Sequence, residues 1–291
     1  MKQEIGYLLY DDRDYAVNQH FAEHMRSEGQ KRGLLIEPVL LSELQIGTTK
    51  EGIPYCYRNG DIAKPDFVLS RQRHALISNH FQLMGIPVYN NAKVCDICND
   101  KRKTHLFLAD IPMPKTTFLA PDAKQPPVDT VFPVVLKPAC SHGGDRVTLA
   151  ENKAQWHAAA AAILPQPALQ QNLVSNAGHD LRVYIVFGEI IAGVMRTAKE
   201  GIVSNFKLGG IATYHELTQD ERRLAEEIIK RFDEAGAPLC LAGVDFLYED
   251  GKPVLGEVED VVGSRMLYHT SDIDIVSLFL DKLLDIRAQQ E

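Results

Sequence analysis

The 291-residue sequence has few cysteines, one tryptophan and no excess of positive charge. Its five cysteines are an odd number for a disulfide framework, so we expect reduced thiols. Cys95 and Cys98 have the spacing of a redox or zinc motif, but no second pair and no thioredoxin-like pattern accompanies them. A lone pair is weak evidence for such a site, so we expect two structural thiols in a loop or at a helix start.

Long apolar runs are also missing. No stretch approaches the ~20 apolar residues that span a bilayer. Residues 5–10 enter a strand, and no signal-peptide pattern precedes them. The net charge of −8 argues against a nucleic-acid surface and against a polybasic membrane anchor. The sequence therefore predicts a cytoplasmic protein without nucleic-acid or membrane partners.

Strands and helices alternate in the first part of the chain. Apolar residues recur at helical spacing in residues 15–32 and 75–84. Short apolar runs that predict strands lie at residues 5–10, 34–40, 67–70 and 86–89. This alternation predicts a small α/β domain with a mostly parallel sheet. The acidic residues 11–14 follow the first strand, where open α/β sheets bind ligands, although a charged surface loop is the simpler interpretation.

Residues 241–260 predict a hairpin with acids inside its apolar strands. Asp245 lies in the first strand and Glu257 and Glu259 in the second, and buried carboxylates need a cation. A two-residue turn would put Asp245 and Glu257 on opposite faces, whereas a three-residue loop with Gly251 left-handed brings all three acids to one face. Such a set suits Mg²⁺. We expect the odd-length loop; an exposed charged strand face is the alternative.

A second segment combines a lysine with glycines. The strand at residues 132–138 contains Lys137, and a loop with Gly143 and Gly144 leads to a strand at residues 147–149. Such a loop can lay backbone N–H groups over phosphates while the lysine supplies charge. It lacks the P-loop pattern, so a simple hairpin turn remains an alternative. Residues 115–131 read as a loop, and a helix is expected at residues 103–109 with Asn99 or Asp100 as N-cap.

The second half of the chain adds two arginines inside apolar strands. Arg182 and Arg196 belong to a hairpin that turns at Phe187 and Gly188. Buried guanidinium groups are costly unless they meet anions, either the acids above or a phosphate. Thr218 begins a capping box for the next helix, and a last helix spans residues 274–289.

The order and spacing of these features resemble the ATP-grasp superfamily, most closely its RimK-like α-L-glutamate ligase branch. The resemblance implies an α/β (α+β) ATP-grasp fold with an N-terminal pre-ATP-grasp α/β domain. The implied domains are residues 1–96 (pre-ATP-grasp), 97–172 (central, with a phosphate lid) and 173–291 (C-terminal, with a metal site). The segments that carry the resemblance are residues 99–101, 135–138, 169–173, 178–182, 192–196, 204–205, 209–210, 243–245 and 256–259.

The resemblance also implies roles for particular residues. Arg182 and Arg196 would hold the acyl phosphate and the acceptor substrate. The implied metal ligands are Asp245, Glu257 and Glu259, holding Mg²⁺ or Mn²⁺. The implied ATP-binding residues are Lys101, Lys137, Ser141, His142, Gly143, Gly144, Gln171, Asn172, Leu173, Asp180 and Asn205.

The sequence departs from the family pattern at three places. Glu259 stands where asparagine is usual, so it is expected to ligate the metal or to turn toward an arginine such as Arg265. Ser141 and Arg146 replace lid glycines, which predicts a stiffer lid. Gln171 replaces a glutamate in the hinge. No phosphate-binding lysine or core acid is lost, so an active enzyme is expected.

The implied function is an ATP-dependent carboxylate–amine ligase that forms an acyl phosphate and then an amide. The acceptor can be a small molecule, a peptide or a protein C-terminus. A glutathione-synthetase-like or D-Ala–D-Ala-like ligase is an alternative, and so is an ATP-binding module without catalysis. Arg265 can meet a substrate carboxylate or pair with a neighbouring acid. ATP, an amino acid and a carboxylate are the expected partners, and relatives suggest a homodimer or homotetramer.

Overall fold

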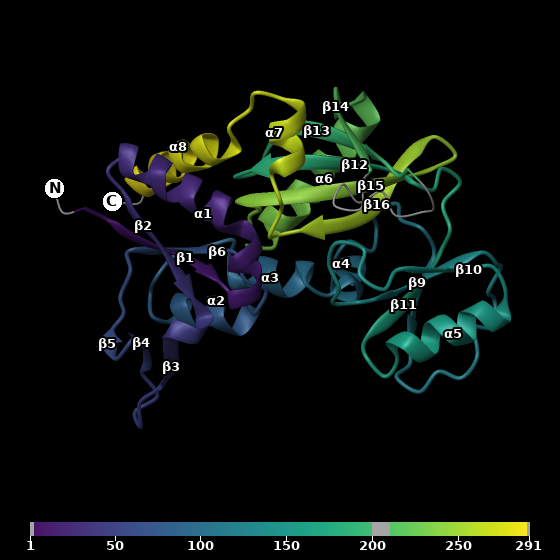
Figure 1. Ribbon diagram of the computed structural model, residues 1–291, viewed down its shortest axis with the longest axis horizontal. Helices are drawn as coiled ribbons and strands as arrows, with labels where there is room; N and C mark the ends of the chain where they lie inside the picture. Colours follow the sequence, from purple (N-terminus) through teal and green to yellow (C-terminus); the bar gives the residue numbers. More distant parts are fainter. Residues whose placement is uncertain (1–2, 200–209, 290–291) are drawn as a thin grey trace.

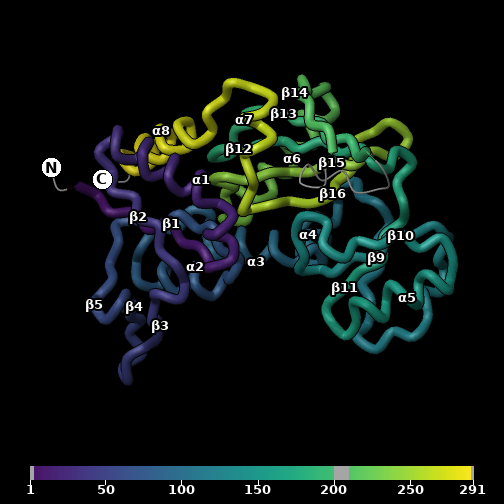
Figure 2. The backbone as a smooth tube through the Cα atoms, in the orientation of Figure 1, coloured from purple at the N-terminus to yellow at the C-terminus, as the bar shows by residue number. Residues whose placement is uncertain are grey.

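The structure, a computed structural model, describes residues 3–199 and 210–289. These residues form four sheets with helices around them (Figure 1). The backbone trace shows the N-terminal elements and the last helix together at one end, and residues 116–172 at the other (Figure 2). Within the described ranges, no helix is both long and apolar enough to cross a membrane.

The first sheet is parallel throughout, as the alternation of strands and helices predicts. Its order is β2 (Leu35–Leu40), β1 (Ile5–Tyr10), β6 (Phe67–Ser70) and β7 (Val88–Tyr89). The helices beside it are α1 (Asp12–Lys31), α2 (Ala75–Leu83) and, from the end of the chain, α8 (Ile275–Ala288). One apolar core contains Leu8 of β1, Met25 of α1 and Phe279 of α8, so the last helix packs against the first domain.

The acidic residues 11–14 begin α1 and do not form the surface loop that we considered simpler. Asp11 is the N-cap, and its Oδ1 accepts a hydrogen bond from the backbone N–H of Asp14 at 2.8 Å. Carboxylates at a helix N-terminus satisfy free N–H groups and oppose the positive end of the helix dipole. This local chemistry explains why the helix starts three residues before its apolar pattern.

A small antiparallel sheet that the sequence did not predict projects from the first domain (Figure 1). It follows the short 3₁₀ helix η1 (Leu41–Glu43) and consists of β3 (Leu44–Thr48), β4 (Pro54–Arg58) and β5 (Asp61–Ile62). Gly52 and Gly60 have φ of 80° and 94° in its turns, a backbone conformation that glycine adopts without a steric penalty.

Two short helices connect the first domain to the next sheet. In α3 (Ala92–Cys98) both Cys95 and Cys98 are buried, and burial raises the pKa of each thiol, so they are unreactive structural residues. The second helix, α4 (Lys101–Phe107), begins two residues earlier than expected. Asp100 is its N-cap and accepts a hydrogen bond from the backbone N–H of Arg102.

The central sheet is antiparallel with the order β10 (Thr148–Ala150), β9 (Val134–Pro138), β11 (Ala168–Asn172) and β8 (Thr116–Leu119). Strand β8 lies in a segment that we expected to be a loop. Helix α5 (Lys153–Ile163) covers one face, where Trp156 is fully buried and donates a hydrogen bond to Gln170 at 2.7 Å. Lys137 and Gln171 therefore lie on the other face, because side chains alternate along each strand.

The largest sheet is antiparallel and formed by the second half of the chain. Its order is β14 (Ile211–His215), β13 (Glu189–Thr197), β12 (His179–Val186), β15 (Leu241–Glu249) and β16 (Lys252–Glu259). Helix α6 (Gln219–Glu234) covers one face, and α7 (Arg265–Thr270) follows β16. The predicted capping box is present: Thr218 and Glu221 each accept a hydrogen bond from the other's backbone N–H.

The expected odd-length loop between β15 and β16 is wrong. Glu249 pairs with Lys252 across a two-residue turn, in which Asp250 and Gly251 have φ of 48° and 76° as a type I′ turn requires. A register shift between Asp245 and Phe246 brings the acids together instead, because the strand pairing changes by one residue there. Asp245 then lies opposite Glu257 rather than Gly256. A β-bulge thus brings the acids to one face of the hairpin, which is the effect that we had expected from an odd-length loop.

Candidate active site

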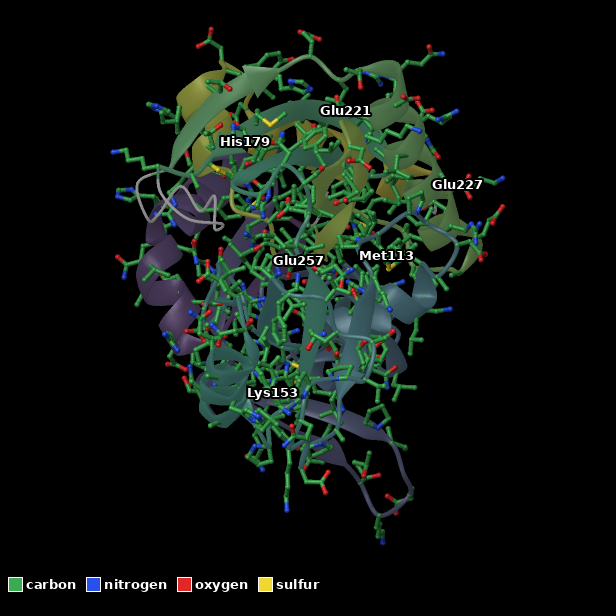
Figure 3. All side chains as sticks on the ribbon, turned by 90° about the vertical axis from the view of Figure 1, so that its right-hand side faces the viewer. Met113, Lys153, His179, Glu221, Glu227 and Glu257 are labelled. Carbon is green, nitrogen blue, oxygen red and sulfur yellow. The ribbon has the colours of Figure 1, made fainter. Side chains whose placement is uncertain are left out.

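The candidate site lies where α4, the central sheet and the C-terminal sheet meet. Figure 3 shows Glu257 near the middle of the molecule, between the C-terminal sheet and the domain that carries Lys153. The Nζ atom of Lys101 in α4 lies 2.9 Å from Oε1 of Glu257 in β16. Both parts of the molecule therefore contribute charge to a single site.

Asp245 is the centre of an ion-pair network on the C-terminal sheet. Arg182 binds it through two hydrogen bonds, Nε to Oδ1 at 2.8 Å and Nη2 to Oδ2 at 2.7 Å, and lies directly opposite it on β12. Arg196 adds a contact from Nη2 at 2.7 Å and also pairs with Asp180. Burial acts to raise the pKa of Asp245, but the two arginines outweigh it and hold the pKa below its usual value.

Glu259 turns toward an arginine, although not toward Arg265. Its Oε2 lies 2.6 Å from Nη2 of Arg182. Arg265 opens α7, is exposed, and has no ion pair with any acid in the part of the chain that the structure describes. The extra acid at position 259 therefore balances the charge of Arg182, and Arg265 is left facing solvent.

The three expected metal ligands share a face but do not converge. Among residues 3–199 and 210–289, the one group of three acidic, histidine or cysteine residues with ligating atoms within 4.8 Å of one another is His24, Glu28 and Asp274. That group joins α1 to α8, away from the candidate site. At the candidate site the oxygens are held by Lys101, Arg182 and Arg196.

The donor set nevertheless fits a hard divalent cation. Glu257 and Glu259 are half-buried, and a metal ion can replace the cationic partner of each, Lys101 and Arg182. Asp245 is the more constrained donor, because a metal would have to displace a bidentate arginine. The chemistry of the oxygens fits Mg²⁺, provided that the lysine and arginine contacts rearrange.

Lys137 has a neutral partner at the position where the resemblance described above implies a glutamate. Its Nζ donates to Oε1 of Gln171 at 2.7 Å, and Gln171 donates in turn to the hydroxyl of Thr116 at 3.0 Å. Burial and the nearby charge of Lys101 lower the pKa of Lys137 to about 8, and Glu257 opposes this shift. The substitution at position 171 therefore leaves Lys137 short of negative charge.

The predicted lid begins inside the protein and ends outside it. Ser141 is buried, and its carbonyl oxygen accepts a hydrogen bond from Nζ of Lys101 at 2.5 Å. Gly143 and Gly144 have φ of 66° and 81°. Burial, and next the charge of Arg73, lower the pKa of His142 to about 4. The loop thus brings backbone groups next to Lys101.

The remaining predicted residues lie at the edges of the site. Asn172 ends β11 and its backbone N–H donates to the carbonyl of Lys115 at 2.9 Å, and Leu173 follows it. Asn205 lies outside the described residues. The structure thus groups Lys101, Lys137, Gln171 and the acidic hairpin, and it places Arg265 apart from their contacts.

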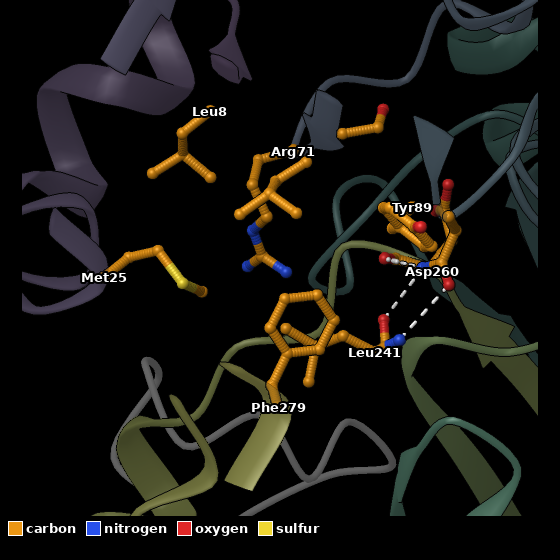
Figure 4. A pocket seen from close by; sticks show the side chains of 10 residues that line it. Leu8, Met25, Arg71, Tyr89, Leu241, Asp260 and Phe279 are labelled. Atoms are coloured by element: carbon orange, nitrogen blue, oxygen red, sulfur yellow. Dashed lines mark hydrogen bonds between the residues drawn. The ribbon is translucent and has the colours of Figure 1, made fainter. Parts of the chain in front are cut away.

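Sequence reasoning missed a buried pair next to this network. Asp260 accepts hydrogen bonds from Nδ2 of Asn99 on both oxygens, at 3.0 Å each, and burial raises its pKa to about 7. Arg71 donates from Nη2 to the carbonyl of Val262 at 2.8 Å. Figure 4 shows Arg71 and Asp260 lining one pocket between the first domain and the C-terminal sheet. An arginine directly after the buried strand β6 was the available signal.

The fold is that of solved ATP-grasp ligases. The crystal structure of D-alanine–D-alanine ligase from Bacillus anthracis complexed with ATP matches with a TM-score of 0.72 and 19% identity, over 99% of this chain and 100% of that chain. The ATP-grasp ligase PsnB complexed with its minimal precursor matches with a TM-score of 0.65 and 17% identity, over 100% and 99%. At such identities the likeness concerns the fold alone, and it confirms the predicted ATP-grasp fold.

The sequence relatives identify the family within this fold. Residues 98–283 match the family model of the RimK-like ATP-grasp domain. A probable alpha-L-glutamate ligase from Maridesulfovibrio salexigens is 31% identical over 217 residues, which cover 70% of this chain and 69% of the relative. Another from Shewanella loihica is 26% identical over 279 residues, 91% of each chain. The chain belongs to the RimK-like ATP-grasp family and is an ATP-dependent carboxylate–amine ligase.

Proposed function

We propose that this protein activates a substrate carboxylate with ATP and Mg²⁺ and joins it to the amine of an amino acid, with L-glutamate as the first candidate. The placement of Lys101 against Glu257, beside Lys137, carries the proposal. Two lysines that would bind phosphates thus lie near the carboxylates of the C-terminal hairpin that would bind the metal. The relatives named as probable alpha-L-glutamate ligases support glutamate as the amino acid.

The nucleotide would bind between the central and C-terminal sheets. Lys101 and Lys137 would neutralise phosphate oxygens, and the backbone N–H groups of the lid would cover them. Phosphates would also replace the negative charge that Lys137 lacks at position 171. The other proposed ATP-binding residues are Ser141, His142, Gly143, Gly144, Gln171, Asn172, Leu173, Asp180 and Asn205.

Glu257 and Glu259 would hold Mg²⁺, with Asp245 as the third ligand. A divalent cation bound here would supply charge neutralisation between the phosphates and the carboxylates. Mn²⁺ has the same preference for oxygen ligands. A metal held by Glu257 would replace Lys101 as the partner of this carboxylate, and the lysine would then be free to bind a phosphate.

The chemistry has two steps. An oxygen of the substrate carboxylate attacks the γ-phosphorus of ATP, the bond to the β–γ bridging oxygen breaks, and ADP leaves. The amine then attacks the carbonyl carbon of the acyl phosphate, loses a proton to solvent, and phosphate leaves with one oxygen of the original carboxylate. Arg196 would donate to the oxyanion of the tetrahedral intermediate, and Arg182 would hold the acyl phosphate. The lid would exclude water, which otherwise hydrolyses the acyl phosphate.

A D-Ala–D-Ala-like ligase is the second candidate, because the D-alanine–D-alanine ligase of Bacillus anthracis has the same fold over nearly the whole chain. An ATP-binding module without catalysis is the third, motivated by the acid at position 259. Arg265 is exposed and forms no ion pair in the described ranges, so its guanidinium group would be available to bind a substrate carboxylate.

A screen for ADP release tests these candidates. Purified protein with ATP and Mg²⁺ is mixed with L-amino acids, D-amino acids, small carboxylates and short peptides, and ADP is measured. The proposal expects ADP that depends on an L-amino acid together with a carboxylate. Lys137→Ala should abolish this ADP release. Lys153 is an exposed lysine on α5, and Lys153→Ala should leave the ADP release unchanged. If the protein binds ATP but releases no ADP with any pair of carboxylate and amino acid, the result contradicts the proposed ligase activity.

We further infer a cytoplasmic, homo-oligomeric enzyme without nucleic-acid or membrane partners. Charge and composition support this inference, and the resemblance to the family supports the oligomer and the three domains at residues 1–96, 97–172 and 173–291. Light scattering after size-exclusion chromatography tests the oligomer. A monomer at micromolar concentration contradicts it.

A further inference from the structure

His105 is a buried histidine whose ring finds no hydrogen-bond partner in the described part of the chain. It lies on α4 one turn after Lys101, on the same helix face, and its residue is 6% exposed. Neither Nδ1 nor Nε2 donates or accepts a hydrogen bond within residues 3–199 and 210–289. The ring makes an edge-on aromatic contact with Phe118, with ring centroids 6.5 Å apart. Buried polar groups are rarely left unpaired, so this ring needs an explanation.

The surroundings of His105 are those of the phosphate site. Leu169 lies opposite both Lys137 and Phe118 in the central sheet, so these three side chains form one row on the face away from α5. His105 contacts this row at Phe118 and is close enough to Lys137, Lys101 and Glu257 for their charges to act on it. An unpaired ring thus lies near the two lysines that we assign to the nucleotide and the glutamate that we assign to Mg²⁺.

The environment also fixes the form of the ring. Burial, and next the charge of Lys137, lower the pKa of His105 to about 4. A neutral imidazole carries one N–H donor and one acceptor nitrogen. It can therefore donate to an anion without adding a third positive charge beside two lysines.

We infer that His105 is a nucleotide-binding residue, whose neutral ring N–H donates to a phosphate oxygen of ATP beside Lys101 and Lys137. The inference rests on the proposed function, because it takes the nucleotide to bind between these lysines. It explains why a polar side chain is retained where an apolar one would fill the same space. Without nucleotide the unpaired ring destabilises the protein, and with nucleotide the missing bond is made.

Equilibrium binding of Mg·ATP to three variants tests the inference. His105→Leu should weaken binding about tenfold to hundredfold, since it removes a hydrogen bond to a charged group. The same variant should melt at a higher temperature than wild type without nucleotide, because an unpaired buried group is gone. His105→Gln keeps a neutral donor and should bind within about threefold of wild type. His157→Leu, on α5 beside Trp156, is the control and should not change binding.

Several results would overturn the inference. Wild-type affinity in His105→Leu would mean that the ring serves only packing or a buried water. Equal loss of Mg·ATP affinity in His105→Gln and His105→Leu would mean that binding depends on the shape of the ring and not on its N–H donor. The ¹⁵N chemical shifts of the imidazole should also change on adding Mg·ADP, and unchanged shifts contradict a direct contact.

The two proposals fail in different ways. Wild type that binds Mg·ATP but forms no ADP contradicts the ligase only, and loss of binding in His105→Leu still supports the role of His105. Wild type that does not bind Mg·ATP contradicts both.

Discussion

Gln171→Glu should change the pH range in which this protein binds ATP. Burial and the nearby charge of Lys101 lower the pKa of Lys137 from 10.5 to about 8, against the opposing effect of Glu257. The hydrogen bond of its Nζ at 2.7 Å goes to the uncharged amide of Gln171. At pH 7 about 90% of the lysine is then charged, and above pH 8 the charged fraction falls about tenfold per unit. A glutamate at 2.7 Å would raise the pKa by about 1–3 units. The Thr116 hydroxyl accepts from Gln171 and donates to the carbonyl of Pro114 in wild type, and it would have to turn its donor toward the new carboxylate.

The assay is the dissociation constant of Mg·ATP from pH 6.5 to 9.5. In wild type it should rise above pH 8, and in Gln171→Glu the rise should begin at least about one unit higher. Calorimetry in buffers of different ionisation enthalpy should show that wild type takes up about half a proton per ATP at pH 8, and the variant less. Gln166→Glu, an exposed change in the same domain, should behave as wild type.

The same shift predicts a stability effect, and its sign follows from linkage. The pKa of Lys137 is lower in the folded than in the unfolded protein, so the charged lysine destabilises the fold. This cost is fully present below pH 8 and disappears as the pH rises toward 10.5. An affinity for Mg·ATP that is independent of pH in wild type, or equal pH profiles for wild type and Gln171→Glu, would refute the reasoning.

Three further predictions concern the acidic hairpin and its surroundings. Asp245→Asn should destabilise the protein by about 3–5 kcal/mol in urea unfolding, because Arg182 and Arg196 lose their shared counter-charge, and a loss below about 1 kcal/mol would contradict this. Asp260 has a pKa raised to about 7, so its stabilising effect is present below its unfolded pKa and is lost as the pH rises toward 7. Relative to Asp260→Asn, wild type should thus lose unfolding free energy between pH 4 and pH 7, and parallel curves would contradict it. Gly251→Val should cost about 1–2 kcal/mol at its φ of 76°, and an unchanged stability would argue against the type I′ turn.

The parts of the fold with strong periodicity could be predicted from the sequence. The alternation of strands and helices predicted that the strands of the first sheet are mostly parallel. The local sequence predicted the capping box at Thr218. The sheet β3–β5 was missed because its short strands are half-exposed and carry little apolar alternation. Helix α1 starts at Asp12 because its acidic N-terminus favours a helix, a signal that we had interpreted as a loop.

The candidate site shows a different limit. The residue types were visible, since a lysine next to glycines and acids inside apolar strands are unusual in any sequence. Their pairing was not, because a β-bulge leaves no mark in the spacing of Asp245 and Glu257. His105 and Asp260 were missed for a related reason. Their importance comes from burial and missing or costly partners, which depend on elements distant in sequence.

The most direct test of the central claim is the fate of a carboxylate oxygen. The carboxylate substrate found by the ADP screen is labelled with ¹⁸O and incubated with enzyme, ATP, Mg²⁺ and the amino acid. The phosphate that is released is then analysed by mass spectrometry. Activation as an acyl phosphate predicts one ¹⁸O atom from the carboxylate in each phosphate. Unlabelled phosphate would show that water attacks ATP, and it would contradict ligation through an acyl phosphate.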